Sequence, residues 1–314
     1  MVMKRWIIFF LFLVLGQALQ AKTSDQPREF FSHEREILIT LLEGDGFERD
    51  FLREVFWDQR LEHRPSALFK NIHHKENPRD YSDFTKSYSI HLAKRFQRRW
   101  VTELKRASHK YQVDKEVLVA ILLVETGLGN ILGNYPVISV FSSILVEHEK
   151  NRNLYPLIHQ MDDKLAYRLR RLQKKAAWAK VELKALLTIA QDLDKSPYSY
   201  KGSYAGAFGL PQFLPSSYLK WGADSDNNGT VNLFLVPDAL HSTARYLQGH
   251  GWRAGLTKKK HRKAHRKAVY AYNRSQIYVD TILKVAKILH RHNHKKAHKA
   301  KSVEVAANSQ MGNY

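Results

Sequence analysis

One stretch of the chain, VLVAILLVETGLG at residues 117–129, organises the rest of the fold. Its first eight residues are all apolar, and Asp114, a typical N-cap residue, precedes them with Glu116 in the first turn. This pattern predicts a buried helix over residues 114–125 that opens into a glycine-rich loop. Glu125 is placed at the junction between the helix and the loop.

The position of Glu125 has a chemical consequence. Burial disfavours the charged form of a carboxyl and raises its pKa, which an acid requires if it is to hold its proton near neutral pH. A glutamate at a helix end can equally be hydrogen-bonded to its own loop in a purely structural role. On position alone, the two interpretations are equally supported.

Helical patterns also occupy most of the remaining chain, whereas strand patterns are almost absent. Apolar residues at three- and four-residue steps predict two short helices in 34–57, separated by Gly44-Asp45-Gly46. Further helices are expected at 85–111, 165–193, 236–247 and 270–289. The turn-rich stretches 127–136, 196–215 and 222–232 are where a helical protein usually builds a site. We expect an all-α fold.

The composition excludes several classes of protein. With 314 residues, 44% apolar residues, 15 Gly and 9 Pro, the chain is globular. It has no Cys, which excludes disulfides, cysteine-ligated metals, a thiol nucleophile and the cysteine of a lipoprotein anchor. The net charge of +21 predicts a polyanionic partner, which can be nucleic acid, an anionic membrane or a carboxylate-rich polymer.

The first 21 residues predict export. Lys4 and Arg5 precede the apolar run 6–15, and small residues follow up to Ala21, as in a cleavable signal peptide. A retained membrane anchor is the alternative, but the run falls well short of the roughly 20 residues that span a bilayer. We therefore expect a mature periplasmic protein from Lys22 that is not a lipoprotein, and nucleic acid is not expected as a partner.

A second motif, SYAGAFGLPQFLPSSY at residues 203–218, predicts a tight turn that a ligand can approach closely. Three small residues at 205–207, Gly209 and two prolines define the turn. Gln212 and the hydroxyl groups are neutral hydrogen-bonding partners, which suit a sugar. A purely structural turn is the alternative.

These two motifs, followed by HGW at 250–252 and YNRSQIY at 272–278, resemble the membrane-bound lytic murein transglycosylase B family, a lysozyme-like group. The resemblance covers about residues 117–289 and extends loosely back to about residue 34. It implies a lysozyme-like catalytic domain over 109–289, an N-terminal helical extension over 22–108 and a basic His/Lys-rich tail over 290–314. It implies Glu125 as the single catalytic acid/base. The implied substrate-binding residues are Ser203, Gln212, Tyr272, Asn273 and Tyr278.

The implied reaction cleaves the β-1,4 bond between N-acetylmuramic acid and N-acetylglucosamine in peptidoglycan and forms a 1,6-anhydro product. Glu125 protonates the glycosidic oxygen and then, as a carboxylate, accepts the proton of the attacking C6 hydroxyl. No second carboxylate and no cofactor are required for this chemistry, unlike in ordinary glycosidases. The alternatives are a hydrolytic muramidase on the same scaffold and a noncatalytic peptidoglycan-binding scaffold. A nucleic-acid-binding protein ranks third.

The segment DSDNNGTVN at residues 224–232 matches the start of an EF-hand calcium loop. Leu235 occupies the place of the usual bidentate Glu, but Asp238 can close a lengthened loop, an arrangement similar to that of the family. We expect a structural calcium ion in preference to a calcium-free turn. The expected ligands in loop 224–238 are Asp224, Asp226, Asn228, Thr230 and Asp238.

The chain departs from the family pattern at three places. Leu128 stands where the family usually has an aromatic residue, and Lys174-Lys175 replace a paired Arg. Residues 253–271 are short and basic where the family commonly has a longer insertion. Residues 253–301 hold 16 Lys and Arg against one acid, Asp280, which suits adhesion to peptidoglycan carboxylates or to an anionic envelope surface.

Two further groups of side chains leave alternatives open. The histidines at 290, 292, 294 and 298 are assigned to a solvated basic tail rather than to a metal site, because no structural element is expected to hold them. Tyr81, Phe84 and Tyr88 are spaced like one helical face and form either an aromatic wall of the cleft or a core stripe.

Overall fold

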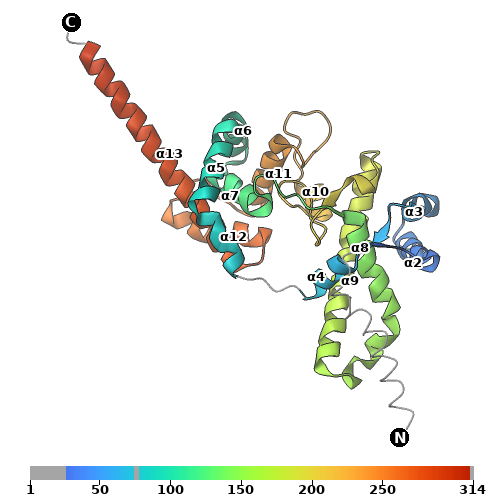
Figure 1. Cartoon of the computed structure of the whole chain (residues 1–314). Helices are drawn as coiled ribbons and strands as arrows, with labels where there is room; N and C mark the ends of the chain where they lie inside the picture. Colours follow the sequence, from blue (N-terminus) through green and yellow to red (C-terminus); the bar gives the residue numbers. More distant parts are fainter. Residues whose placement is uncertain (1–25, 74–77, 312–314) are drawn as a thin grey trace. The chain divides into compact units, whose positions relative to one another are not determined.

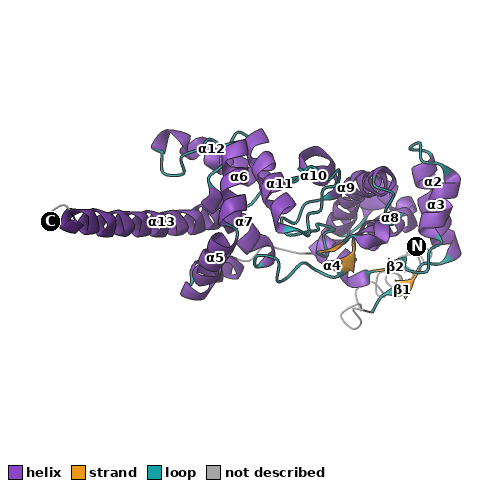
Figure 2. Ribbon diagram, turned by 90° about the horizontal axis from the view of Figure 1, so that it is seen from above, coloured by secondary structure: helices purple, strands orange, loops and turns teal. Residues whose placement is uncertain are grey.

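The computed structural model describes residues 26–73 and 78–311, with the backbone alone for 78–80 and 294–311 (Figure 1). The expected signal peptide, 1–21, lies outside the described residues. Helices form nearly all the regular structure of the described chain (Figure 2). Its strands are two-residue segments: β1 (Arg28–Glu29) pairs antiparallel with β2 (Glu62–His63), and β3 (Tyr135–Pro136) with β4 (Lys201–Gly202). The all-α fold is confirmed.

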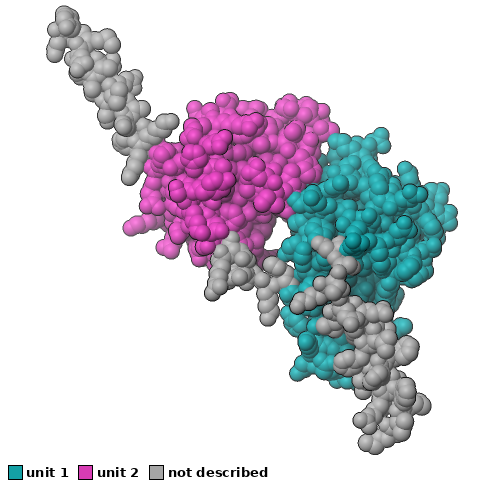
Figure 3. Space-filling model, in the orientation of Figure 1, with its two compact units in different colours: residues 1–75, 133–208, 213–219 teal, residues 76–132, 209–212, 220–314 magenta. Residues whose placement is uncertain are grey.

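The chain forms two compact units, each assembled from segments that are far apart in the sequence (Figure 3). Unit 1 comprises residues 1–75, 133–208 and 213–219, and unit 2 comprises 76–132, 209–212 and 220–314. These bounds do not coincide with the expected domains 22–108 and 109–289, which stay predictions.

Unit 2 is built around α7 (Lys115–Thr126). The side chains from Val117 to Leu123 are at most 2% exposed, because a helix without a polar face is stable only inside a core. Four helices contact α7: α5 (Ser87–Arg99), α6 (Val101–Tyr111), α11 (Val236–Gly249) and α13 (Gln276–Met311). The 3-10 helix η1 (Pro78–Thr85) also contacts α7, while η4 (Lys259–His261) and α12 (Arg262–Tyr272) extend the unit beside α11 and α13.

Asp114 occupies the N-cap position of α7, but its side chain makes no capping hydrogen bond. Its carboxylate instead accepts from Nε1 of Trp252 (3.0 Å) and from the backbone N–H groups of Gly255 and Leu256 (3.1 Å each). The expected N-cap position of Asp114 is therefore confirmed, but its side chain binds a distant loop and not the first turn of its own helix. The HGW motif at 250–252 has a structural role here, because its Trp ties the loop after α11 to the start of α7.

Unit 1 has α8 (Val137–Lys150) packed along α9 (Asp163–Asp192) as its centre. The helices α2 (Ser32–Glu43) and α4 (Pro65–His73) pack on α8, and α3 (Arg49–Phe56) packs on α2. The short helices of this part of the chain are η2 (Arg152–Gln160), η3 (Pro197–Ser199) and α10 (Pro215–Trp221). The expected set of helices lacks α8, whose β-branched and hydroxyl residues weaken the helical signal and whose burial stabilises it.

The expected helices are mostly confirmed, with corrections at their breaks. The pair in 34–57 is α2 and α3, whereas the pattern 85–111 is divided into α5 and α6 at Trp100. The expected helix 270–289 is two helices, because α12 ends at Tyr272 and α13 begins at Gln276. Tyr81 and Phe84 lie in η1 and Tyr88 lies in α5, so the three aromatic residues do not form one helical face.

The last helix, α13, is 36 residues long and continues to Met311. The expectation that no structural element holds residues 290–301 is therefore wrong for the backbone, because the Lys, Ala and Arg residues of this segment favour helix. In the part of the chain that the structure describes, no helix is both long enough and apolar enough to cross a bilayer.

Candidate active site

The end of α7 is a left-handed turn that presents Glu125. Gly127 has φ +56°, and its N–H donates to the carbonyl of Leu123 (3.0 Å), which closes the helix as in an αL motif. Leu128 and Gly129 continue the turn with φ values of +64° and +96°. The chain thus reverses directly after Glu125 and does not cover its side chain with further helix.

Thr126 fixes the second motif beside this turn. Its hydroxyl donates to the carbonyl of Leu210 (2.9 Å) and accepts from the N–H of Gly129 (3.1 Å). Thr126 is 1% exposed, so these bonds are shielded from water. The Glu-Thr pair of the first motif therefore has two separate tasks: Glu125 faces the site and Thr126 holds the segment 209–212 against it.

Gln212 is held by its own side-chain amide. Its Nε2 donates to the carbonyls of Gly209 (3.0 Å) and Leu132 (3.2 Å), and its backbone has φ +50°. Among the described residues, none donates a hydrogen bond to its Oε1. Gln212 is half-buried, which leaves this oxygen as an acceptor for a hydroxyl or amide group of a ligand.

Two tyrosines from the last helices complete the site around Glu125. The Tyr278 hydroxyl donates to Oε1 of Glu125 (2.5 Å), and the Tyr272 hydroxyl donates to the carbonyl of Pro211 (2.6 Å). Their rings are nearly parallel, with centroids 6.4 Å apart. Tyr81 packs edge-on against Tyr278 at 6.3 Å. The site is therefore lined by aromatic rings. The hydroxyl of Tyr278 faces the carboxyl of Glu125, and that of Tyr272 faces the turn at Pro211.

The environment of Glu125 favours its protonated form. Burial raises its pKa from 4.5 to about 7, while the hydrogen bond from Tyr278 opposes this rise. Among the described residues, no cation forms an ion pair with Glu125. The side chain nevertheless keeps some exposed surface, so the carboxyl is both desolvated and within reach of a ligand. Such a group gives and accepts a proton near neutral pH.

Asn273 lies at the break between α12 and α13. Its backbone is extended (φ −141°, ψ +123°), and its carbonyl accepts from the N–H of Ser275 (2.8 Å). The Ser275 hydroxyl then accepts from the N–H of Tyr278 (3.2 Å), which caps the start of α13. This break places Tyr272 and Tyr278 on two different helices that face Glu125. Sequence periodicity alone does not reveal it.

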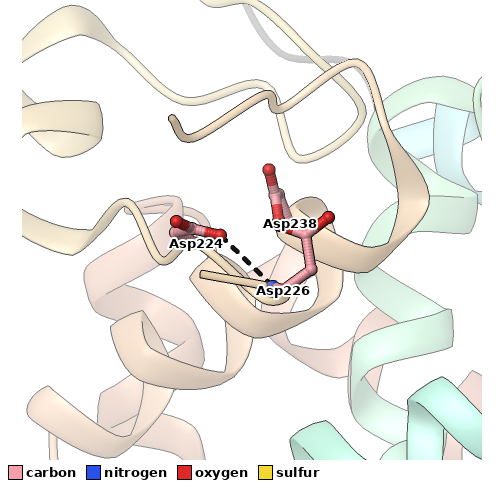
Figure 4. Close-up of side chains that lie close together, drawn as sticks. All are labelled: Asp224, Asp226 and Asp238. Atoms are coloured by element: carbon pink, nitrogen blue, oxygen red, sulfur yellow. Dashed lines mark hydrogen bonds between the residues drawn. The ribbon is translucent and has the colours of Figure 1, made fainter. Parts of the chain in front are cut away.

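The Asp-rich loop gathers three carboxylates in unit 2 (Figure 4). One oxygen from each of Asp224, Asp226 and Asp238 lies within 4.8 Å of the others. Asp224 accepts from the N–H groups of Asn227 and Gly229 (2.8 Å each), which folds the loop around its carboxylate. Asp238 is 3% exposed and accepts from the N–H of Ser225 (2.9 Å) and of Asn232 (2.7 Å).

This donor set suits a hard cation. Carboxylate and carbonyl oxygens are the ligands that calcium prefers, and three negative charges this close repel one another without a cation. Gly229, with φ +88°, makes the sharp turn that the sixth position of such a loop needs. Asn228 accepts from the N–H (2.9 Å) and the hydroxyl (2.8 Å) of Thr230, which places both residues in the same turn.

A family model decides the classification of the chain. The model described as the transglycosylase SLT domain matches residues 31–264, which is most of the chain. The chain belongs to the transglycosylase SLT domain family. The resemblance to lytic murein transglycosylases is thereby confirmed.

A curated relative supports the same classification. The chain is 31% identical over 160 residues to membrane-bound lytic murein transglycosylase B from Escherichia coli, a match that covers 51% of this chain. It spans 38% of the length of that relative.

Three solved structures share the fold of this transglycosylase SLT domain protein. The soluble lytic transglycosylase SltB1 from Pseudomonas aeruginosa is 22% identical with a TM-score of 0.67, covering 83% of this chain and 99% of that chain. Escherichia coli Slt35 in complex with calcium is 20% identical with a TM-score of 0.63, covering 83% and 93%. Pseudomonas aeruginosa SltB3 in complex with NAG-anhNAM-pentapeptide is 18% identical with a TM-score of 0.65, covering 82% and 78%.

The structure brings together most of the expected site residues of this family member. Contacts within unit 2 link Glu125, Tyr278, Tyr272 and the 211–212 segment, and Asn273 follows Tyr272 directly. Ser203 belongs to unit 1, where its hydroxyl accepts from the N–H of Ala207 (3.3 Å). Its role in substrate binding stays a prediction.

One aromatic neighbour of the site was missed by the sequence analysis. Tyr246 packs its ring against Tyr272 (4.8 Å) and donates its hydroxyl to the carbonyl of Ala271 (2.7 Å). His250 stacks on Tyr246 at 4.1 Å. In the sequence, Tyr246 is one more apolar position of the amphipathic α11, so nothing distinguishes it from a core residue.

The departure at Lys174-Lys175 has a local structural basis in unit 1. The Lys175 ammonium lies 4.2 Å from the Trp178 ring centroid and donates to Oδ1 of Asn71 (3.4 Å). Burial lowers the pKa of Lys175, whereas Lys174 is exposed. Lys175 therefore makes specific contacts where the family pattern has an arginine, whereas Lys174 is a solvent-facing lysine.

The structure also forms a hollow of about 650 Å³ at the opposite end of α7 from Glu125. Its lining includes Lys105, His109, Asp114, Glu116 and Asn293. Asp114 is bound to Trp252, and Glu116 accepts from Asn293 (2.9 Å), so both carboxylates are engaged in structural bonds. The hollow shares no residue with the site at Glu125.

Proposed function

We propose that this protein is a peptidoglycan lytic transglycosylase in which Glu125 is the single acid/base. The pair of Glu125 and Tyr278, with the Glu125 pKa raised to about 7, is the observation that carries this proposal. Membership of the transglycosylase SLT domain family and the fold shared with lytic transglycosylases support it. Another structure with this fold, Pseudomonas aeruginosa SltB3, is in complex with NAG-anhNAM-pentapeptide.

The reaction proceeds in two proton transfers. Protonated Glu125 gives its proton to the glycosidic oxygen as the bond from C1 of N-acetylmuramic acid to that oxygen breaks, which releases the N-acetylglucosamine end with a 4-hydroxyl group. The C6 hydroxyl oxygen of the same N-acetylmuramic acid then bonds to C1, and its proton returns to Glu125. Water is not consumed, and Glu125 ends the cycle protonated.

The surrounding residues assist each transfer. The Tyr278 hydroxyl stabilises the carboxylate that exists between the two transfers, because its hydrogen bond favours the ionised form. Gln212 and Asn273 supply amide groups to sugar hydroxyl or acetamido groups, and Tyr272 holds the turn that carries Gln212. Ser203 is proposed to add a further contact to the substrate.

A single carboxylate distinguishes this reaction from hydrolysis. Two-carboxylate glycosidases place their carboxyl groups about 5–10 Å apart, where the two charges influence each other. The pKa of Glu125 is set by burial and by Tyr278, and no other described carboxylate contributes to it. The proposed reaction needs no such second carboxylate, because the C6 hydroxyl of the substrate takes the place of water as the nucleophile.

The decisive experiment is mass spectrometry of the products released from purified sacculi. We expect muropeptides that end in 1,6-anhydro-N-acetylmuramic acid, and no release by Glu125→Gln, which is nearly isosteric but cannot give up a proton. Reducing ends would identify a hydrolytic muramidase instead. Binding to sacculi without any release by the wild-type protein would identify a noncatalytic scaffold.

A structural calcium ion belongs to the same proposal. Asp224, Asp226 and Asp238 would hold it, together with Asn228 and the carbonyl of Thr230, in the loop that leads into α11. Support comes from the donor set and from the calcium complex of Escherichia coli Slt35, which shares the fold. The ion would stiffen the loop and take no part in bond cleavage.

The remaining parts of the proposal concern compartment and partners. Export by residues 1–21 places the protein in the periplasm, where peptidoglycan is the polymer at hand, and leaves nucleic acid out. The basic segment 253–301 is proposed to contact a polyanion of the envelope, either the carboxylates of peptidoglycan or an anionic membrane surface. Localisation by cell fractionation with a periplasmic marker tests the first of these statements.

A further inference from the structure

The two helices that flank the break at Asn273 carry exposed cations. In α13, Lys284, Lys287 and Arg291 recur at three- and four-residue steps and are all exposed, while most of the apolar residues between them are buried in unit 2. In α12, Arg262 and Lys263 are exposed as well. We call these five side chains the basic face. Within the described residues, none of the five forms an ion pair.

Arg266 joins the two helices on this side. Its guanidinium donates to Oδ1 of Asp280 (2.5 Å) and to Oε1 of Gln276 (2.7 Å). Asp280 lies one turn before Lys284 on the exposed stripe of α13, and Arg262 lies one turn before Arg266 on α12. The exposed sides of the two helices therefore meet, and Asp280, the one acid of residues 253–301, is already paired with Arg266.

The shape and composition of the basic face indicate the kind of partner. Its charges are spread along two helices, and none of the five lines the hollow near Asp114, which suits an extended polymer with repeated charges better than a compact anion. Helices that enter a membrane surface present a stripe of Leu, Phe or Trp, whereas Leu283 and Val285 are buried. The large apolar side chain exposed here is Tyr270, an aromatic ring with a hydroxyl, which suits contact with sugar rings.

We propose that the basic face holds the protein on peptidoglycan through the carboxylates of its stem peptides, at a surface separate from the Glu125 site. This inference rests on the proposed function, since it takes the wall polymer as substrate. Opposite charges raise the local concentration of glycan strands and are screened by salt. The basic face therefore acts on binding to the insoluble polymer and leaves bond cleavage unchanged.

The test compares two variants that lose the same charge. The face variant carries Lys284→Gln, Lys287→Gln and Arg291→Gln. The control variant carries Lys164→Gln, Lys195→Gln and Arg98→Gln, three exposed residues outside the basic face. Binding is measured by co-sedimentation with purified sacculi at low and high salt, with sacculi whose carboxylates have been amidated, and with vesicles of phosphatidylglycerol. Circular dichroism checks that both variants fold.

We expect the face variant to bind sacculi about tenfold more weakly at low salt, and the control variant to bind like the wild-type protein. Amidated sacculi should bind the wild-type protein as weakly as intact sacculi bind the face variant. Three results would each overturn the proposal. They are an equal loss of sacculus binding in both variants, unchanged binding of the wild-type protein to amidated sacculi, and tighter binding to vesicles than to sacculi. Turnover of a short soluble glycan should be equal in all three proteins, and absence of anhydro products there would refute the proposed function without changing the binding result.

Discussion

The Tyr278 hydroxyl donates a 2.5 Å hydrogen bond to Oε1 of Glu125, although 153 positions separate the two residues in the chain. Burial raises the pKa of Glu125 to about 7, and this hydrogen bond opposes the rise because it favours the ionised carboxylate. Tyr278 is 1% exposed and is braced by the rings of Tyr272 and Tyr81, so its hydroxyl has little freedom to turn away. The protonation of the site is thus set by two opposed effects with separate structural origins.

The pH dependence of lysis should follow this balance. Glu125 gives its proton only when protonated, so wild-type activity is expected to fall as the pH rises through about 7. Tyr278→Phe removes the bond that lowers the pKa and should move this alkaline limb upward by about one pH unit, with a lower maximal rate. Sacculus lysis measured across pH checks this, with Tyr88→Phe as the exposed control. A limb that stays in place or moves downward contradicts the assignment.

The stability of Glu125→Gln should also depend on pH. The carboxyl has a pKa of 4.5 ordinarily and of about 7 when folded, so the unfolded chain gives up this proton at a lower pH than the folded protein does. The folded state therefore loses stability as the pH rises from 4.5 to about 7, and the loss is absent below pH 4.5 and constant above pH 7. Glutamine does not ionise, and the variant should be more stable than the wild-type protein by about 3 kcal/mol at pH 8 and unchanged at pH 4. Urea unfolding at both pH values measures this. The exposed Glu54→Gln should show no such difference, and an equal effect of Glu125→Gln at both pH values would exclude the raised pKa.

The second motif requires glycine at position 209. Gly209 has φ +72°, and a Cβ there would lie 2.5 Å from Cβ of Leu233. Gly251 has φ +86°, and a Cβ added there would have no atom within 4 Å. Replacing Gly251 by Ala therefore measures the cost of the positive φ without any steric clash. Gly251→Ala should lower the free energy of unfolding by about 1 kcal/mol and Gly209→Ala by about 2–4 kcal/mol. Thermal unfolding measures the difference, and equal losses would show that contact with Leu233 is unimportant.

The hydrogen bonds between the Asp114 carboxylate and the loop after the HGW motif should be sensitive to the replacement of one carboxylate oxygen by an NH₂ group. Asp114→Asn turns an NH₂ group toward donors that now face a carboxylate, and we expect a loss of about 1.5–3 kcal/mol in the free energy of unfolding. Asp162 is the N-cap of α9, and its side chain accepts hydrogen bonds from the backbone N–H groups of Lys164 and Leu165. Asp162→Asn should change stability by less than about 0.5 kcal/mol, because Asn caps as well as Asp. Similar losses in both variants would mean that Asp114 acts as an ordinary cap.

Calcium should stabilise the protein without taking part in catalysis. At a hundredfold excess over its Kd, a cation bound only to the folded state raises the free energy of unfolding by about 2.7 kcal/mol. Thermal unfolding with calcium and with EDTA is expected to differ for the wild-type protein. Asp226→Asn should remove this difference while keeping the stability measured in EDTA, since Asp226 is exposed. Equal unfolding temperatures in calcium and EDTA for the wild-type protein would identify a calcium-free turn.

Local sequence was sufficient to predict the elements whose apolar composition requires them to be buried. The run 117–124 is apolar on every side, so α7 has to be central whatever packs on it. The turn after Glu125 follows from Gly127 and Gly129, which adopt positive φ at little cost. The order of the motifs was enough to predict the family by resemblance, and that resemblance in turn implied Glu125 as the acid/base residue.

Long-range packing decided the remaining features of the fold and of the site. No local pattern places the Tyr278 hydroxyl on Glu125, turns Asp114 away from its own helix, or assigns Ser203 and Glu125 to different compact units. These outcomes depend on which partner satisfies a buried polar group, and that partner comes from a segment far away in the chain. The sequence by itself determined an all-helical protein with one conspicuous carboxyl group. Only the tertiary structure decided how that carboxyl is desolvated and which hydroxyl it faces, since a pKa depends on neighbours in space.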